Sequence, residues 1–87
     1  MIFLKDLIFY PFTSDPKYFA DRCSFYRPTK EFVESLGGHW HFISCEYDPE
    51  YPAYRVEYSS LDGRRMHLTV LAVGGKYPPD ITFSISG

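Results

Sequence analysis

The sequence predicts an α+β fold in which an N-terminal strand and two short helices pack on a four-stranded antiparallel meander sheet. Two observations indicate this class. Helix start and stop signals are confined to the first half of the chain, and a strong hairpin signal lies between segments of alternating polarity in the second half. The 87 residues, 1–87, are expected to form a single domain with a modest core.

The predicted sheet is centred on a hairpin over residues 54–73. Residues 54–58 and 66–70 alternate in polarity with a period of two, and Asp62-Gly63 between them favours a tight turn. A two-residue loop would mix charged and aliphatic side chains on each face. A three-residue loop, Leu61-Asp62-Gly63, removes that mixture and puts Gly63 in the left-handed conformation of a G1 bulge.

In this register the hairpin has one apolar face and one polar face. The expected apolar pairs are Tyr54 with Val70, Val56 with Leu68, and Tyr58 with Met66. The expected polar pairs are Arg55 with Thr69, Glu57 with His67, and Ser59 with Arg65. The polar face therefore carries a Glu–His pair flanked by two arginines.

The segment before the hairpin is expected to begin with a strand and continue with two helices. Residues 2–10 are rich in Ile, Leu, Phe and Tyr, which favours a strand. Asp15 precedes Pro16 and caps a first helix over residues 16–23. A second helix runs over residues 28–36 and ends at Gly37-Gly38. Both helices are too short to be stable alone, so we expect them to pack on the sheet.

Two further strands complete the prediction. Residues 39–46 are expected to direct Trp40, Phe42 and Ser44 to one face of the sheet and His39, His41, Ile43 and Cys45 to the other. Residues 81–85 close the sheet, with Ile81, Phe83 and Ile85 directed inward.

The connection before the hairpin is acidic and rich in tyrosine. Residues 46–52 contain three carboxylates and two tyrosines and are stiffened by two prolines. Such a preorganised loop could bury tyrosines in a partner while its carboxylates pair with Lys or Arg. The predicted partner-binding residues are Glu46, Tyr47, Asp48, Glu50 and Tyr51. The alternative is an ordinary solvated hairpin loop in which the prolines only turn the chain.

An enzymatic interpretation uses the polar face of the hairpin. Cleaving RNA through a 2′,3′-cyclic phosphate needs a base, an acid and cations that hold the phosphate. Here Glu57 would be the base, His67 the acid, and Arg55 and Arg65 the phosphate-binding groups. The alternative is a cross-strand Glu–His pair that only adds to the stability of the sheet.

Residues 56–65 resemble part of a known family of enzymes. Val56-Glu57-Tyr58, the turn and Arg64-Arg65 distantly resemble the small microbial ribonucleases, which place glutamate and arginine on neighbouring strands of an antiparallel sheet. The resemblance implies metal-independent RNA cleavage. In that family the acid histidine lies near the C-terminal hairpin, where this chain has no histidine, so His67 would have to replace it.

Composition narrows the function classes. The net charge of −2 argues against general nucleic-acid binding. Cys23 and Cys45 are interpreted as reduced core thiols, and the sequence leaves open a single disulfide between them. A metal site formed by His39, His41 and His67 is an alternative interpretation of the histidines. Solvated histidines on a sheet face are the preferred interpretation, and no metal or cofactor is expected. No signal peptide or membrane span is expected, which makes the cytoplasm the default compartment.

The sequence therefore favours a small cytoplasmic, non-enzymatic protein-binding module, most concretely an inhibitor or immunity-type protein with a protein partner that has a basic surface. The first alternative is the ribonuclease. The second is a structural or assembly subunit, and the sequence also leaves open a homodimer in which the N-terminal strand crosses to another chain.

Overall fold

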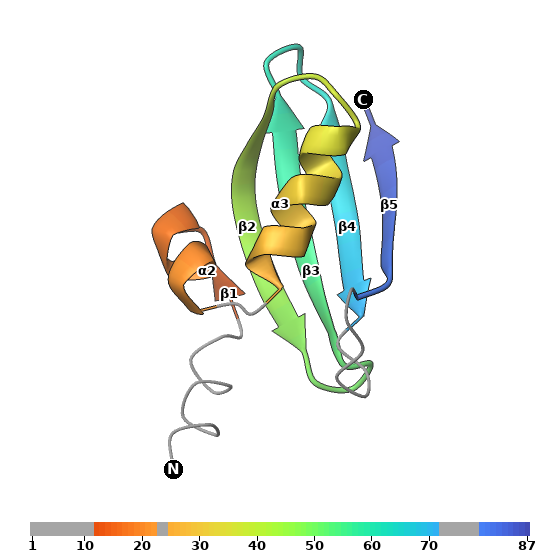
Figure 1. The fold of residues 1–87 in the computed structure, drawn as a ribbon. Coiled ribbons are helices and arrows are strands. Elements are labelled where there is room, and N and C mark those ends of the chain that lie inside the picture. Colours follow the sequence, from red (N-terminus) through yellow and green to blue (C-terminus); the bar gives the residue numbers. More distant parts are fainter. Residues whose placement is uncertain (1–11, 23–24, 72–78) are drawn as a thin grey trace.

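The computed structural model describes residues 12–22, 25–71 and 79–87, and its architecture confirms the α+β class. The strands are β1 (Phe12–Thr13), β2 (Trp40–Asp48), β3 (Ala53–Ser60), β4 (Arg65–Leu71) and β5 (Ile81–Ser86), and the helices are α2 (Pro16–Arg22) and α3 (Tyr26–Ser35). The strands form one antiparallel sheet in sequence order (Figure 1). The strand expected over residues 2–10 lies outside the described residues.

The prediction of a four-stranded sheet is wrong, because β1 adds a fifth strand. Phe12 lies opposite Glu46, and Thr13 lies opposite Cys45 at the outer edge of β2. Two residues are too few to show an alternation of polarity, so the sequence carries no pattern that would mark them as a strand.

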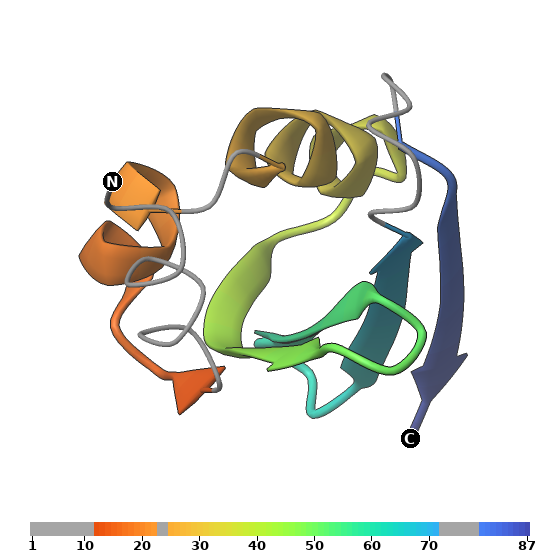
Figure 2. The same cartoon turned by 90° about the horizontal axis from the view of Figure 1, so that it is seen from below.

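The two helices occupy different places on the sheet. α3 lies across one face, whereas α2 lies beside the β1–β2 edge (Figure 2). α3 therefore covers the centre of the apolar face, as predicted for both helices, whereas α2 contacts that face only at its edge (Figure 2). α2 has seven residues and reaches the core through Phe19, whose ring stacks on Phe42 at a centroid distance of 4.8 Å.

The ends of the helices follow the predicted signals in part. Asp15 accepts a hydrogen bond from the Lys17 amide through Oδ1 at 3.0 Å, which confirms the cap of α2. α3 begins at Tyr26, before the predicted start at Pro28. It is followed by Gly37 with φ +79°, a left-handed C-terminal residue.

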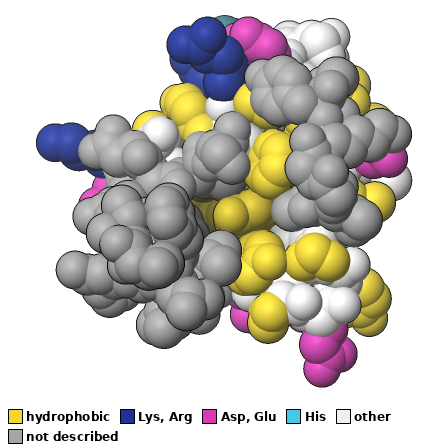
Figure 3. All heavy atoms as spheres, turned by 60° about the horizontal axis from the view of Figure 1, so that its bottom comes forward, with side chains coloured by type: hydrophobic (Ala, Val, Ile, Leu, Met, Phe, Trp, Pro, Cys, Tyr) yellow, Lys and Arg dark blue, Asp and Glu magenta, His cyan; other side chains and the backbone are white. Residues whose placement is uncertain are grey.

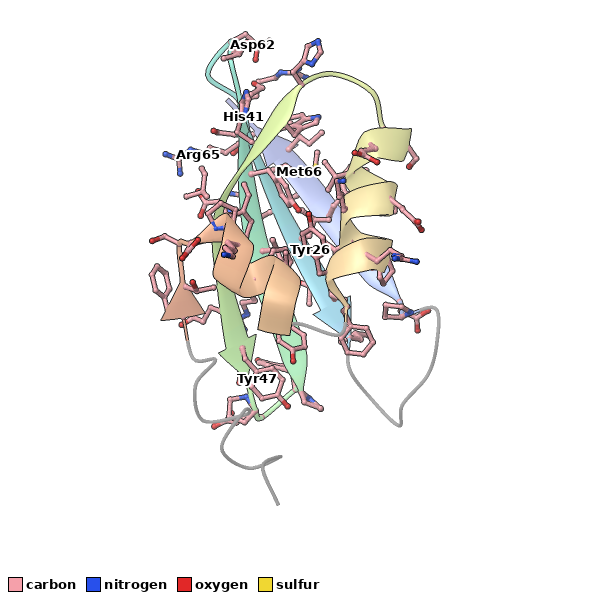
Figure 4. All side chains as sticks on the ribbon, turned by 60° about the vertical axis from the view of Figure 1, so that its left-hand side comes forward. Tyr26, His41, Tyr47, Asp62, Arg65 and Met66 are labelled. Carbon is pink, nitrogen blue, oxygen red and sulfur yellow. The ribbon has the colours of Figure 1, made fainter. Side chains whose placement is uncertain are left out.

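The core lies between α3 and the face of the sheet that α3 covers (Figure 4). Its fully or almost fully buried members come from α2, α3 and the three central strands: Phe19, Val33, Cys45, Tyr54, Val56, Tyr58, Met66, Leu68 and Val70. The opposite face of the sheet, called the open face here, carries no helix in the described part of the chain (Figure 2).

The predicted register of the central hairpin is confirmed. Val56 lies opposite Leu68, and Glu57 lies opposite His67. The Ser60 amide donates to the Arg64 carbonyl at 3.0 Å, which leaves residues 61–63 as a three-residue loop. Gly63 has φ +92°, as the G1 bulge requires.

The predicted faces of β2 are wrong beyond Phe42. Phe42 lies opposite Tyr58, but Ser44 lies opposite Glu57 and Cys45 opposite Val56, because Ile43 is left unpaired in a β-bulge. Cys45 therefore enters the core, where it is fully buried, and Ser44 reaches the open face. A bulge residue exchanges the faces of every residue after it, and nothing in the alternation of polarity marked its position.

The prediction that three side chains of β5 point inward is correct for their face but not for their burial. Ile81, Phe83 and Ile85 lie opposite core residues of β4, and the Phe83 ring contacts Phe32 of α3 at a centroid distance of 5.3 Å. Phe83 nevertheless remains 45% exposed and Ile85 42% exposed. α3 covers the centre of the sheet and leaves this edge open (Figure 1).

Candidate functional site

The acidic, tyrosine-rich stretch is divided between a strand and a turn. Glu46, Tyr47 and Asp48 belong to β2, and Asp48 lies opposite Ala53 at the start of β3. The turn itself is limited to residues 49–52. The structure therefore does not place the five predicted partner-binding residues in one loop, and their directions follow the alternation of the strand.

Tyr47 points away from the other predicted binding residues. It lies opposite Tyr54, and the two rings contact each other at a centroid distance of 4.9 Å on the face that bears α3. Figure 4 shows Tyr47 near the end of the sheet that carries this turn. Tyr47 is half-buried, so it supports the turn from inside.

Arg55 joins the turn to the open face. Its guanidinium donates to Oδ2 of Asp48 at 3.2 Å and lies 5.4 Å from the centroid of the Tyr51 ring. Asp48 also accepts a hydrogen bond from the Glu50 amide through Oδ1 at 3.0 Å. Asp48 thus holds both the turn backbone and Arg55, and Arg55 in turn holds the Tyr51 ring by a cation–π contact.

Phe12 is a surface residue that the sequence interpretation did not include. It lies opposite Glu46 on the open face and is 61% exposed, while Tyr51 is 62% exposed. Phe12 therefore lies beside Glu46, and the Tyr51 ring lies beside the guanidinium of Arg55, which pairs with Asp48. We call the group formed by Phe12, Glu46, Asp48, Glu50, Tyr51 and Arg55 the acidic-aromatic surface.

The charge of this surface is negative. It carries three carboxylates and one guanidinium, and within the described part of the chain no ion pair is formed by Glu46 or Glu50. Figure 3 looks at the end of the molecule with the turn, where hydrophobic side chains lie at the centre and charged side chains of both signs lie at the rim. Exposed rings beside unpaired carboxylates suit a basic protein partner.

The residues proposed for catalysis lie on the open face as well. Glu57 and His67 are direct cross-strand neighbours, but the Glu57 carboxylate accepts a hydrogen bond from the Arg65 guanidinium. Arg55 is engaged by Asp48. Both predicted phosphate-binding arginines therefore already pair with carboxylates of the chain itself, which competes with binding of a phosphate.

A shallow depression of about 310 Å³ connects the two groups of residues. Phe12 and Glu46 border it on one side, Glu57 and His67 border it on the other, and Arg55 lies between them. The depression is widely open to solvent, so it forms a concave part of the protein surface and does not enclose a substrate.

The histidines and cysteines do not come together. Cys45 lies in the core, whereas His41 lies on the open face in the same row as Ser59 and Arg65. Across residues 12–22, 25–71 and 79–87, no three His, Cys, Asp or Glu side chains are close enough to hold one metal ion. Cys23 lies outside these ranges, so the interpretation of both cysteines as reduced thiols stays a prediction.

Comparisons with protein-family models, with curated proteins and with solved structures found no match to this chain. A helix of sufficient length and apolar character to cross a membrane is not found in the described part of the chain.

Proposed function

We propose that this chain is a non-enzymatic protein-binding module that binds a partner with a basic surface through the acidic-aromatic surface. The observation that carries the proposal is the exposure of Phe12 and Tyr51, at 61% and 62%, beside the carboxylates of Glu46, Asp48 and Glu50. Large exposed rings are costly in water and supply most of the binding energy when a partner buries them.

Each part of the surface has a distinct role in this proposal. The exposed carboxylates of Glu46 and Glu50 would attract Lys or Arg and increase the association rate. Asp48 fixes the turn and orients Arg55, which holds the Tyr51 ring. Because these contacts exist before binding, less conformational entropy would be lost when the partner arrives.

The most concrete form of the proposal is an inhibitor or immunity-type protein. A partner that acts on nucleic acid presents a basic site to the phosphates of its substrate. A negative surface with two aromatic anchors can cover such a site and exclude the nucleic acid. The negative net charge of this chain, −2, favours a partner of opposite sign.

The test uses a variant with two reversed charges, Glu46→Lys/Glu50→Lys. Both side chains are exposed and form no ion pair with the described residues, so the variant should fold as the wild type does. A partner captured from lysate of the native host is purified and titrated against each protein by calorimetry. We expect the affinity of the variant to fall at least about tenfold.

The control is Glu31→Lys/Glu34→Lys on α3, which makes the same change in net charge on the opposite side of the sheet (Figure 2) and breaks only the exposed Lys30–Glu34 ion pair, which contributes little to stability. We expect this control to bind as the wild type does. Equal losses for both variants would show a non-specific charge effect, and unchanged binding by Glu46→Lys/Glu50→Lys would contradict the proposal.

The direct opposition of Glu57 and His67 across β3 and β4 favours a second candidate, the metal-independent ribonuclease. In this candidate Glu57 is the base, His67 the acid, and Arg55 and Arg65 bind the phosphate. Purified protein is incubated with RNA in the presence of a chelator. Cleavage that Glu57→Gln abolishes without loss of the fold would support it, and intact RNA would exclude it.

A further inference from the structure

We propose that β5 is the interface of a symmetric homodimer, in which the β5 strands of two copies pair antiparallel and join two sheets into one. This surface lies at the opposite edge of the sheet from β1 and is distinct from the acidic-aromatic surface. The inference therefore goes beyond the proposed function and does not depend on it.

The edge of β5 lacks the features that normally prevent pairing with another chain. Its sequence, Ile-Thr-Phe-Ser-Ile-Ser, contains no charged residue and no proline. Its register with β4 is regular over all six residues, so no bulge twists it away. Among the described residues no strand lies beyond it. Exposed edge strands without charges, prolines or bulges are templates for strand addition.

The hydrogen-bond pattern identifies which backbone groups face outward. The Leu71 amide donates to the carbonyl of its direct partner Asp80 at 2.9 Å, so this position is a hydrogen-bonded pair. By alternation, Thr82, Ser84 and Ser86 also bond to β4. The N–H and C=O groups of Ile81, Phe83 and Ile85 therefore point away from β4, toward the free edge.

These outward groups specify the register of the dimer. If Phe83 lies opposite Phe83 of a second copy, then Ile81 lies opposite Ile85 of that copy. All outward donors and acceptors of the three residues then pair with one another. Any odd shift would place apolar side chains opposite polar ones on the same face and is excluded by the alternation of the strand.

The side chains favour the same arrangement. A two-fold axis through this pair keeps both α3 helices on one face of the joined sheet. Phe83 and Ile85, now 45% and 42% exposed, would then lie in one apolar stripe across the two joined strands, between the two α3 helices. A second copy of this chain is therefore the partner that fits β5. Phe83 would pair with Phe83 and Ile81 with Ile85 of that copy, so apolar side chains contact apolar side chains and none of them is charged.

The test uses two variants that differ in one residue. Thr82→Lys/Ser84→Lys places two like-charge pairs directly opposite each other across the proposed interface, because Thr82 lies opposite Ser84 of the second copy. Thr82→Lys/Ser84→Glu places opposite charges there instead. Both positions are exposed on the open face of the single copy, so neither variant removes a core contact.

We expect the wild type and the Lys/Glu variant to sediment as dimers and the Lys/Lys variant as a monomer, at concentrations up to about 1 mM. A wild-type monomer across this range would overturn the proposal. A dimer that persists in the Lys/Lys variant would overturn it as well.

Amide hydrogen exchange measured by NMR gives an independent readout. In the dimer the amides of Ile81, Phe83 and Ile85 should be protected, and dilution should release them. The amides of Thr82 and Ser84, which bond to β4, should stay protected at both concentrations. Fast exchange at Phe83 in a sample that sediments as a dimer would place the interface elsewhere and overturn the proposal.

Discussion

Phe42 and Cys45 point into the same core from β2, although an odd number of positions separates them along the strand. Phe42 lies opposite Tyr58, Cys45 lies opposite Val56, and the single unpaired residue Ile43 makes this possible. The bulge decides which face the residues after it occupy. It places Ser44, Glu46 and Asp48 on the open face, and without it the carboxylates of Glu46 and Asp48 would point toward α3.

Deletion of Ile43 should preserve the fold. Removing the extra residue leaves Phe42 and Ser44 adjacent, and the strand then alternates regularly while every side chain keeps its present face. Deletion of Glu57 from β3, which has no bulge, should reverse the faces of half that strand and unfold the protein. Two-dimensional NMR spectra of both variants check this, and an unfolded Ile43 deletion would contradict it.

Replacing Gly63 by alanine should destabilise the protein by about 1–2 kcal/mol. Gly63 has φ +92°, and a Cβ at this position would meet no other atom within 4 Å, so the cost is conformational and not a collision. Urea unfolding measures the change in the free energy of unfolding. Gly63→Asn should lose less, because asparagine tolerates left-handed backbone better. Equal stability of the alanine variant and the wild type would show that the loop has relaxed.

Asp62 should titrate below its ordinary pKa of 3.8. The hydrogen bond from the Ser60 hydroxyl is the main cause of the lowered pKa, and the Arg64 guanidinium adds to it. Ser60→Ala should therefore raise the pKa of Asp62 toward 3.8. NMR titration of the carboxyl carbon measures both values, and an unchanged pKa in the variant would contradict this assignment.

The same shift predicts the direction of a pH effect on stability. A carboxyl whose pKa is lower in the folded state stabilises the protein fully above the unfolded pKa and loses this contribution as the pH falls through the folded pKa. The stability difference between the wild type and Asp62→Ala should thus narrow below pH 3.8. Acid unfolding followed by circular dichroism checks it, and a difference that widens would contradict it.

Truncating Met66 to alanine should lower the free energy of unfolding by about 2–5 kcal/mol. Met66 is fully buried between the sheet and α3, so its loss leaves a cavity (Figure 4). The control is Leu61→Ala in the loop of the same hairpin, where the side chain is 83% exposed and the change should stay within about 0.5 kcal/mol. Urea unfolding of both variants should separate them clearly, and similar losses would contradict the assigned core.

Part of the candidate site could be read from the sequence. The alternation of polarity in the hairpin predicted Glu57 opposite His67 and Arg55 on the polar face. Only a three-residue loop puts residues of like polarity on the same face, so the register follows from the sequence. The interpretation of residues 46–52 as one loop failed, because Tyr47 is packed inward on Tyr54. Phe12 was missed, since a strand of two residues shows no pattern.

The sequence by itself determined the α+β class, the register of the hairpin and the cap of α2, because each depends on contacts between residues close in the chain. Only the tertiary structure decided the bulge at Ile43, the pairing of Phe12 with Glu46 and the incomplete cover of β5 by α3. These three features depend on how distant segments fit in space. Local polarity does not encode where one strand ends beside another or how far a helix reaches across a sheet.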